Sequence, residues 1–324
     1  MVKIGSKNIK TNIFLAPLAG CADLSFRLIA RALGAEFCFY EMADSNSLVW
    51  NSRRKTADMF QAHPEDLPIA AQLLGSDPEI MLTGAKKLLE YNRKISFLDI
   101  NAACPVKKVV QKRAGAHLLR EPELLYGIIS KLSSSLHLPI TVKLRSGYLK
   151  KDIEAIVLIA KRCEEHGAKA LFVHGRTMAQ GYAGEVDYES IRAIKESVKI
   201  PVIGSGNILS PQKAKEMMDL TGCDGILVAR GAFGNPWIFK QIKTFLNKGI
   251  LLPEPGSAEK AAVSIKHIQY VEKYKQMSPR TKLGFARKVA LWYLKGFKNV
   301  SIRRGEIVRA QSIEELLGML GVKI

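Results

Sequence analysis

Cysteine is scarce in this chain. There are five in 324 residues, an odd number, and no two have the C-x-x-C spacing of a metal site. This pattern argues against bound zinc and against a disulfide framework, and it favours a reducing compartment. Long apolar runs are also missing, because no stretch approaches the ~18 residues that a membrane span needs. Residues 1–11 are polar and do not match a secretory signal peptide. We therefore expect a cytoplasmic protein without a membrane span, a metal site or an obligate protein partner.

Acidic residues are few compared with basic ones. The chain has 30 Asp and Glu against 49 Lys and Arg, a net charge of +19 and a pI near 9.7. Such a balance favours a polyanionic partner, most often nucleic acid, although a generally basic, well-solvated surface has the same composition. Residues 243–324 contain 16 Lys and Arg against 6 Glu, so +10 of the charge belongs to these 82 residues. This asymmetry indicates a separate module that binds a polyanion.

Short apolar runs recur eight times before residue 243, and amphipathic stretches separate them. Residues 152–166 are one such stretch, with apolar residues at helical spacing and a stop at Gly167. Ser210 and Pro211 begin another, as an N-cap and a first-turn proline. Near-continuous apolar strands that alternate with helices are typical of a parallel sheet covered on both faces. The eight runs are residues 12–20, 36–42, 69–75, 97–105, 140–147, 170–177, 201–208 and 225–232.

Eight such units in about 240 residues match the size of a (β/α)₈ barrel. An open, doubly wound sheet is the rival, and it predicts the glycine fingerprint G-x-G-x-x-G after an early strand. The stretch 204–209 lacks the third glycine and follows the seventh run. From about Lys243 the strand pattern stops and only helical patterns follow. We therefore predict an α/β protein in which residues 1–242 form a TIM barrel. A smaller, basic, all-helical domain covers residues 243–324.

Functional groups of a barrel lie at the carboxyl ends of its strands. Several of the predicted strand ends carry polar or small residues of a kind that binds ligands. A single polar strand end has little meaning, because solvent begins there. Six on one rim indicate a site. They include Gln72, Asn101 with Cys104, Lys143 with Arg145, His174 with Arg176, Gly206 with Asn207, and Arg230 with Gly231.

The last two strand ends have the features of a phosphate site. Gly204 to Gly206 precede one helix, and Ala229 to Gly231 precede the next. Small residues let backbone N–H groups approach a phosphate, and a helix N-terminus favours negative charge. The usual phosphate site of barrels follows strands seven and eight. We therefore predict FMN, with Arg230 supplying charge, Lys143 and His174 holding the ring and ribityl chain, and Gln72 pairing with the pyrimidine edge.

Cys104 follows a strand end, in a stretch rich in Lys and Arg. Free thiols have a pKa of about 8.5 and are mainly protonated at neutral pH, so a thiol can act as an acid. A buried structural cysteine is the alternative, and it is the usual fate of this residue type. For the other four cysteines, including Cys163 in a predicted helix, we expect the structural role.

Taken together, these segments resemble the tRNA-dihydrouridine synthase family from Leu15 to about Phe239, and more loosely beyond. Each motif is soft, whereas the ordered set at matching strand ends is specific. The tail residues Ala286-Arg287-Lys288 with Trp292-Tyr293 resemble the branch labelled B. The barrel motifs are Leu15-Ala16-Pro17-Leu18, Gln72-Leu73-Leu74-Gly75, Asn101 to Pro105 with Ala114-Gly115 and Leu118-Leu119, Lys143 to Gly147, His174 to Thr177, Gly181 to Gly184, and Asp224 to Gly231.

The resemblance implies a role for each matching position. The flavin would be bound by Ala16, Pro17, Leu18, Gln72, Lys143, His174, Ser205, Gly206, Asn207, Ala229 and Arg230. The target uracil would be oriented by Asn101, Arg145 and Tyr182, and the RNA would contact Arg287 and Lys288. Cys104 would be the proton donor.

The reaction implied by the resemblance reduces the C5–C6 double bond of specific uridines in tRNA to 5,6-dihydrouridine. NADPH (or NADH) would reduce FMN, flavin N5 would give hydride to uracil C6, and Cys104 would protonate C5. A stacked base cannot reach a barrel mouth, so the uridine must be extruded or already unpaired. The basic tail would grip folded RNA by its backbone. Two alternatives are a flavin barrel that reduces a small molecule and one that acts on ribosomal RNA. A barrel that only binds RNA is a further one.

Overall fold

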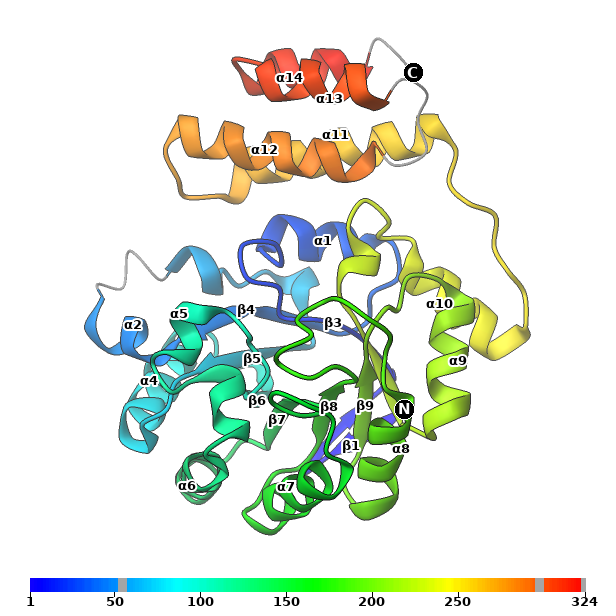
Figure 1. Cartoon of the computed structure of the whole chain (residues 1–324). Coiled ribbons are helices and arrows are strands. Elements are labelled where there is room, and N and C mark those ends of the chain that lie inside the picture. The colour runs from blue at the N-terminus through cyan, green and yellow to red at the C-terminus, as the bar shows by residue number, and fades with distance from the viewer. Residues whose placement is uncertain (52–56, 295–299, 322–324) are drawn as a thin grey trace.

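A closed barrel of eight parallel strands forms the body of the protein (Figure 1). The computed structural model describes residues 1–51, 57–294 and 300–321. The barrel closes because the last strand pairs with the first, Ile226 opposite Ile13. The predicted fold class is confirmed, and each strand overlaps its predicted run. The strands are β3 (Ile13–Leu15), β4 (Cys38–Asp44), β5 (Ile69–Leu74), β6 (Ile95–Asn101), β7 (Ile140–Arg145), β8 (Leu171–His174), β9 (Val202–Ser205) and β10 (Gly225–Val228).

Helices follow the strands around the outside of the barrel (Figure 1). Helix α7 lies within the predicted stretch 152–166, and the Asp152 carboxylate caps it by accepting from the Ala155 N–H. Ser210 caps α9 as predicted, and it accepts from the Lys213 N–H. The helices are α1 (Leu24–Ala32), α2 (Ser45–Trp50), α4 (Pro78–Tyr91), α5 (Lys107–Val110), α6 (Pro122–Ser135), α7 (Ile153–Glu165), α8 (Tyr188–Ser197), α9 (Pro211–Thr221) and α10 (Ile238–Lys248).

A short antiparallel hairpin, β1 (Val2–Ile4) and β2 (Lys7–Ile9), precedes the barrel and was not predicted. Its apolar residues are buried against an inner cluster of strand phenylalanines that includes Phe14 and Phe172. These two rings lie edge to face, with centroids 5.6 Å apart. The hairpin thus helps to close the end of the barrel opposite the polar strand ends.

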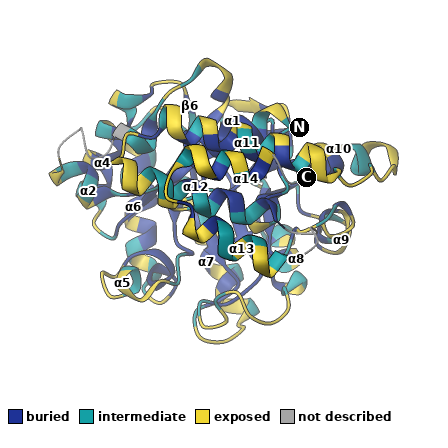
Figure 2. Ribbon diagram, turned by 90° about the horizontal axis from the view of Figure 1, so that it is seen from above, coloured by how far each residue is buried: buried dark blue, intermediate teal, exposed yellow. Residues whose placement is uncertain are grey.

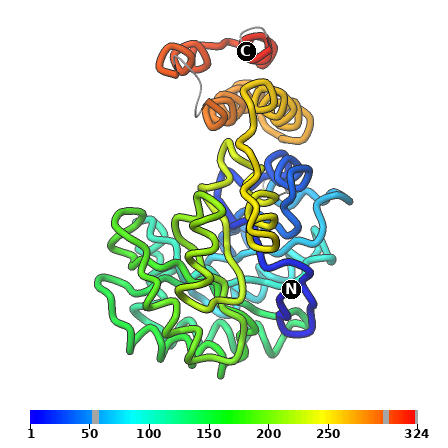
Figure 3. Tube along the Cα trace, turned by 90° about the vertical axis from the view of Figure 1, so that its right-hand side faces the viewer, coloured from blue at the N-terminus to red at the C-terminus, as the bar shows by residue number. Residues whose placement is uncertain are grey.

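The chain after the barrel consists of helices alone in its described part. They are α11 (Ser257–Tyr274), α12 (Pro279–Tyr293), α13 (Val300–Arg309) and α14 (Ile313–Gly321). Buried and exposed residues alternate along α11 and α12 (Figure 2), and buried residues of both helices, such as Ile268 and Val289, share a separate apolar core. Residues 249–256 rise without helix or strand from α10 to α11 (Figure 3). The expected boundary at residue 242 falls inside α10.

Polar and aromatic contacts join the helices to the barrel. Lys275, at the end of α11, is only 5% exposed and its Nζ lies 3.0 Å from Asp23 Oδ2. Gly234 has φ +65°, and a Cβ there would lie 1.9 Å from the carbonyl oxygen of Trp292 in α12, so the backbones meet where only glycine fits. Phe233 stacks on the same tryptophan, with ring centroids 4.6 Å apart. The helical part therefore has a defined position beside the barrel rim.

Candidate active site

The polar strand ends come together at one rim of the barrel. Asn101 ends β6 opposite Lys143 of β7, and Arg145 ends β7 opposite His174 of β8. His174 pairs in turn with Ser205 of β9. Because these residues are register neighbours, they follow one continuous arc at the carboxyl ends of the strands. The structure thus gathers residues that are up to 104 positions apart in the chain, from Asn101 to Ser205.

A chain of hydrogen bonds passes through the side chains at this rim. Asn101 Oδ1 accepts from the backbone N–H groups of Ala103 at 3.0 Å and Cys104 at 2.8 Å. Asn101 Nδ2 donates to Gln72 Oε1 at 2.8 Å, and Gln72 Nε2 donates to Asp99 Oδ2 at 2.7 Å. The loop that carries Cys104 is therefore fastened to the interior of the barrel through two amides.

The carboxylate at the end of this chain, Asp99, was missed in the sequence, as was its neighbour Thr141. Thr141 Oγ1 donates to Asp99 Oδ1 at 2.6 Å. Burial raises the pKa of Asp99 to about 6, and the hydrogen bonds from Gln72 and Thr141 oppose that increase. One signal was available. A lone carboxylate interrupts an apolar strand two residues before Asn101, and so on the same face of that strand.

Cys104 itself is half-buried, whereas Cys38 and Cys163 are buried. Its carbonyl accepts from the N–H of Ala116 at 3.0 Å. Gly115 has φ +63°, and a Cβ there would lie 2.8 Å from the Cys104 carbonyl oxygen. Only glycine allows this approach of the two backbone segments. The loop around Cys104 therefore has a fixed shape on both sides of the thiol.

Arg145 links the loop after β6 to the loop after β8. Its Nε donates to the carbonyl of Ala103 at 2.7 Å. Its Nη1 donates to the carbonyls of Thr177 at 2.8 Å and Gly181 at 2.9 Å. Tyr182 follows in the second loop, and its ring centre lies 6.0 Å from the Arg145 guanidinium carbon. A buried cation thus ties together two loops, one of which carries Cys104.

Tyr182 is exposed to 61% and lies between cations. The guanidinium carbon of Arg230 is 4.5 Å from its ring centre. Arg176 holds the next residues of the loop, donating from Nε to the Ala183 carbonyl at 2.9 Å and from Nη2 to the Gly184 carbonyl at 2.5 Å. An aromatic face is therefore presented to solvent at the rim by a loop that is tethered on both sides.

Positive charge accumulates around His174, where Lys143, Arg145, Arg176 and Arg230 all act on the imidazole. Burial and these charges lower the pKa of His174 to about 2, so its ring is neutral near pH 7. Burial and Arg145 lower the pKa of Lys143 to about 8. Of these two residues, only Lys143 can therefore supply positive charge near pH 7, while His174 offers a hydrogen bond. A site with such an excess of cations suits an anionic ligand.

The turns after β9 and β10 are tightly packed. Gly206 has φ +135°, and a Cβ there would lie 2.9 Å from Val186. A Cβ on Gly231 would lie 2.0 Å from the carbonyl oxygen of Ile208. Asn207 has φ +48°, a left-handed conformation that asparagine tolerates. Turns with positive φ can direct successive N–H groups toward an anion, so the turn after β9 has the form that a phosphate site needs.

The predicted flavin-lining residues after β3 lie next to the end of β10. The N–H of Ala16 donates to the carbonyl of Val228 at 2.9 Å. Leu18 and Ala229 both pack against the inner aromatic cluster of the barrel. Pro17 lies between Ala16 and Leu18 in the sequence and is half-buried. These residues thus belong to the same rim as the turns after β9 and β10.

The two predicted RNA contacts of the tail make hydrogen bonds within the protein. Arg287 donates from Nε to the Ala310 carbonyl at 3.1 Å, just beyond the end of α13. Lys288 donates to the Gly20 carbonyl in the loop after β3. Its Nζ also lies 5.4 Å from the ring centre of Trp292. Both side chains therefore fasten elements of the fold to one another, and Lys288 does so at the rim.

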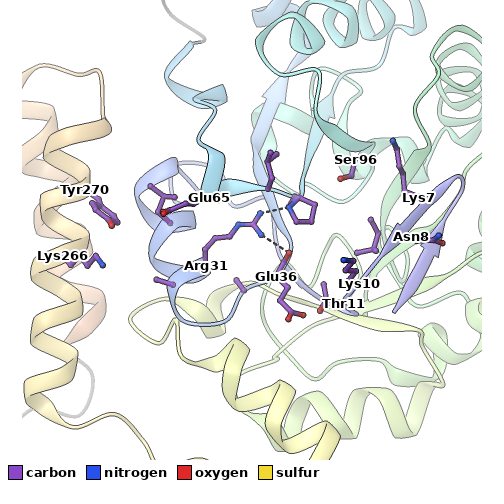
Figure 4. A pocket seen from close by; sticks show the side chains of 16 residues that line it. Lys7, Asn8, Lys10, Thr11, Arg31, Glu36, Glu65, Ser96, Lys266 and Tyr270 are labelled. Carbon is purple, nitrogen blue, oxygen red and sulfur yellow. Dashed lines mark hydrogen bonds between the residues drawn. The ribbon is translucent and has the colours of Figure 1, made fainter.

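A cavity of about 950 Å³ lies elsewhere, against the N-terminal hairpin, α1 and α11 (Figure 4). Lys7, Lys10 and Lys266 line it together with Tyr270. Arg31 donates across its wall to the carbonyl of Pro68 at 2.6 Å. The predicted rim residues do not contribute to its lining, so this cavity is separate from the candidate active site.

Within residues 1–51, 57–294 and 300–321, no cluster of three or more His, Cys, Asp or Glu side chains is arranged to hold a metal ion. Among the helices in those same ranges, none has both the length and the apolar character required to cross a bilayer.

The fold and its rim define a (β/α)₈ barrel whose site is suited to an anionic cofactor beside a half-buried thiol. Solved barrels share the fold at low identity. Histamine dehydrogenase from Rhizobium sp. 4-9 superposes with a TM-score of 0.59 at 13% identity, over 83% of this chain and 50% of that one. A variant of NCR from Zymomonas mobilis gives 0.55 at 17% identity, over 86% and 95%.

Sequence comparison is more specific. The family model described as dihydrouridine synthase (Dus) matches residues 14–319. The tRNA-dihydrouridine synthase B of Pasteurella multocida is 37% identical, over 99% of this chain and 95% of that protein. Its counterpart in Pseudomonas putida is 38% identical, over 90% and 85%. The chain therefore belongs to the dihydrouridine synthase family, and the predicted resemblance and the predicted flavin-dependent oxidoreductase class are confirmed.

Proposed function

We propose that the chain reduces the C5–C6 double bond of specific uridines in tRNA to 5,6-dihydrouridine, with FMN as cofactor and NADPH or NADH as electron donor. Membership of the family supports the reaction. One observation carries the assignment to this rim. The cation-rich strand ends and the fastened loop of Cys104 meet at the same mouth, linked by Arg145 and by the amides of Gln72 and Asn101.

The residues at the rim fit FMN. Excess positive charge around His174 favours an electron-rich ring and a phosphate, and the tight turns at Gly206 and Gly231 suit the phosphate end. Gln72 lies at the same rim, with its amide held between Asp99 and Asn101. When bound and reduced by NADPH, FMN would supply the hydride that C6 of the uracil receives. The proposed binding set is Ala16, Pro17, Leu18, Gln72, Lys143, His174, Ser205, Gly206, Asn207, Ala229 and Arg230.

Cys104 is the proposed acid. Addition of hydride at C6 of uracil leaves excess electron density on C5. A proton donor fixed beside C5 therefore lowers the barrier to reduction of the double bond. The Cys104 loop is held by Asn101, by Ala116 and by the bond from Arg145 to Ala103. This attachment gives the thiol a defined place before the base arrives, which is what a positioned acid requires.

The target base enters beside Tyr182. Its exposed ring at the rim offers a stacking surface for an extruded uracil, and base–aromatic stacking contributes about 1–3 kcal/mol. Asn101 and Arg145 are the other two residues proposed to orient the uracil. Their hydrogen bonds run to the loops around Cys104 and Tyr182, so they support base binding through the positions of those loops.

The proposed macromolecular partner is tRNA, with residues 243–324 as the helical RNA-binding part and the cytoplasm as the place of action. The +10 charge of this part supports binding through phosphates. Lys107 and Lys108 extend the basic surface to within four residues of Cys104. Both are exposed, and no salt bridge or hydrogen bond of their side chains occurs among the described residues. Arg287 and Lys288 remain candidate contacts of the tail, although each makes a bond within the protein.

The test uses the purified full-length chain with unmodified tRNA. An absorbance scan should show bound flavin, and NADPH oxidation should depend on added RNA. Mass spectrometry of the tRNA should then show a gain of two hydrogens at particular uridines. NADPH oxidation without RNA, coupled to a small unsaturated substrate, would instead assign the barrel to small-molecule reduction. Product in ribosomal RNA but none in tRNA would move the substrate assignment.

A further inference from the structure

We infer that Asp99 is a positioning residue for the Cys104 loop, because its carboxylate terminates the amide chain through Gln72 and Asn101. The inference rests on the proposed role of Cys104 as the acid. Asp99 contacts neither the thiol nor the open mouth, since it is fully buried in the middle of β6. Its effect reaches Cys104 through two intervening side chains, each joined to the next by a hydrogen bond.

The direction of every bond in this chain is fixed by its two ends. The backbone N–H groups of Ala103 and Cys104 can only donate, so Asn101 must face them with its oxygen. The amide nitrogen of Asn101 then faces Gln72, which must present its own oxygen. The nitrogen of Gln72 is left facing inward and requires an acceptor, which Asp99 provides.

Water is not available to replace that acceptor. Asp99 is 0% exposed and Gln72 only 1% exposed. If the acceptor is removed, Gln72 has a buried N–H without a partner, and such groups are strongly disfavoured. Rotating the Gln72 amide would satisfy nothing, because its NH₂ group would then face the NH₂ group of Asn101. Loss of the acceptor at position 99 should therefore displace the Gln72 amide, and with it Asn101 and the loop of Cys104.

This series of hydrogen bonds needs an acceptor at position 99 and does not need a charge there. An asparagine in place of Asp99 can accept from Gln72 with its oxygen and donate with its nitrogen to Thr141 Oγ1, which accepts as well as donates. Leucine has nearly the same shape as asparagine and fills the space without offering an acceptor. We call the hydrogen bonds from Asp99 through Gln72 and Asn101 to the Cys104 loop the relay. Asp99→Leu removes both the acceptor of the relay and the charge, whereas Asp99→Asn removes the charge alone.

The experiment compares wild type, Asp99→Asn and Asp99→Leu as flavin-loaded full-length proteins. Turnover is followed as dihydrouridine formation on tRNA, and Cys104 is probed independently by its rate of alkylation with iodoacetamide. We expect Asp99→Leu to lower kcat about 10- to 100-fold with KM for tRNA little changed, the scale of a misplaced catalytic group. Its Cys104 alkylation rate should shift as well. Asp99→Asn should restore both quantities to within a few-fold of wild type.

Asp224→Ala is the matched control. Asp224 is half-buried and also accepts hydrogen bonds, from Lys195 Nζ and from the N–H of Val202, but no hydrogen bond among the described residues joins it to Gln72, Asn101 or the loop of Cys104. Its loss should reduce stability and leave Cys104 alkylation unchanged. The inference is overturned if Asp99→Asn is as damaged as Asp99→Leu, or if Asp99→Leu leaves the alkylation rate unchanged. A wild-type protein that forms no dihydrouridine would reject the proposed function, while the alkylation series would still test the relay.

Discussion

The Nε atom of Arg145 lies 2.7 Å from the carbonyl oxygen of Ala103, so the last residue of β7 holds the loop that begins after β6. The same guanidinium reaches two carbonyls of the loop that carries Tyr182. A single buried cation therefore sets the separation between the proposed proton donor and the proposed stacking surface.

Arg145→Lys should separate these two loops. Lysine offers a point charge on a flexible stem and cannot span the two loops as the planar guanidinium does. We expect kcat for dihydrouridine formation to fall about 10- to 100-fold while FMN is retained. Arg162→Lys, on the outer face of α7 where Arg162 pairs with Glu165, is the matched control and should be silent. An increase in KM with unchanged kcat would mean that Arg145 binds the uracil without organising the loops.

Cys104→Ala should separate flavin chemistry from proton transfer. FMN content and NADPH oxidation by an artificial acceptor should remain near wild type. Dihydrouridine formation should fall about 10²- to 10⁴-fold, the usual contribution of a general acid. Cys163→Ala is the control, since Cys163 is buried in α7 and should affect stability alone. A variant at position 104 that still converts tRNA at the wild-type rate would show that the proton comes from another group.

The affinity for FMN should fall as the pH rises above about 8. Lys143, whose pKa burial and Arg145 lower to about 8, is charged below that pH and neutral above it. An anionic ligand favours the charged form, so binding takes up a proton and weakens by up to tenfold per pH unit above the free pKa. Fluorescence titration of the apoprotein with FMN between pH 7 and 10 measures this. In Lys143→Met the slope should vanish, and an unchanged slope would assign it to another group.

Lys107 and Lys108 should contact phosphates next to the target uridine. Replacing both with alanine should reduce the slope of log affinity for tRNA against log salt by about 1.4 to 1.8, since each phosphate contact contributes roughly 0.7 to 0.9. The control pair, Lys86→Ala with Lys161→Ala, removes exposed lysines from the outer helices α4 and α7. An equal loss of slope in the control would indicate a diffuse effect of net charge.

The barrel could be predicted from the sequence because each strand is a continuous apolar run, and burial on both faces requires that pattern. The hairpin at Val2–Ile4 and Lys7–Ile9 could not, because three-residue strands carry too little periodicity to distinguish them from a polar leader. The shift to basic composition near residue 243 marked where strands end. It did not mark where the barrel ends, because α10 belongs to the last βα unit and is itself basic.

The sequence predicted which strand ends meet at one rim, and it missed the hydrogen bonds that connect their side chains. Strand-end residues such as Gln72 and Asn101 are visible in the sequence because position alone suggests exposure to a ligand. Asp99 acquires its role from being beside Gln72 across the sheet, which depends on strand register. Arg287 was expected at RNA from its charge. The carbonyl of Ala310 that it satisfies is a neighbour created only by the packing of the helices.

On the proposed function, the ion pair of Lys275 with Asp23 has a consequence for how a uridine would be chosen. This ion pair, together with the close contact of Gly234 with the backbone of Trp292, holds the basic helices at one set distance from the rim where Cys104 lies. An RNA gripped by those helices would present to the thiol whichever nucleotide lies one fixed span away. The enzyme would then select its target uridine by the distance of that nucleotide from the bound part of the folded RNA. A tRNA with one nucleotide inserted between the gripped stem and the loop should be modified at the neighbouring position.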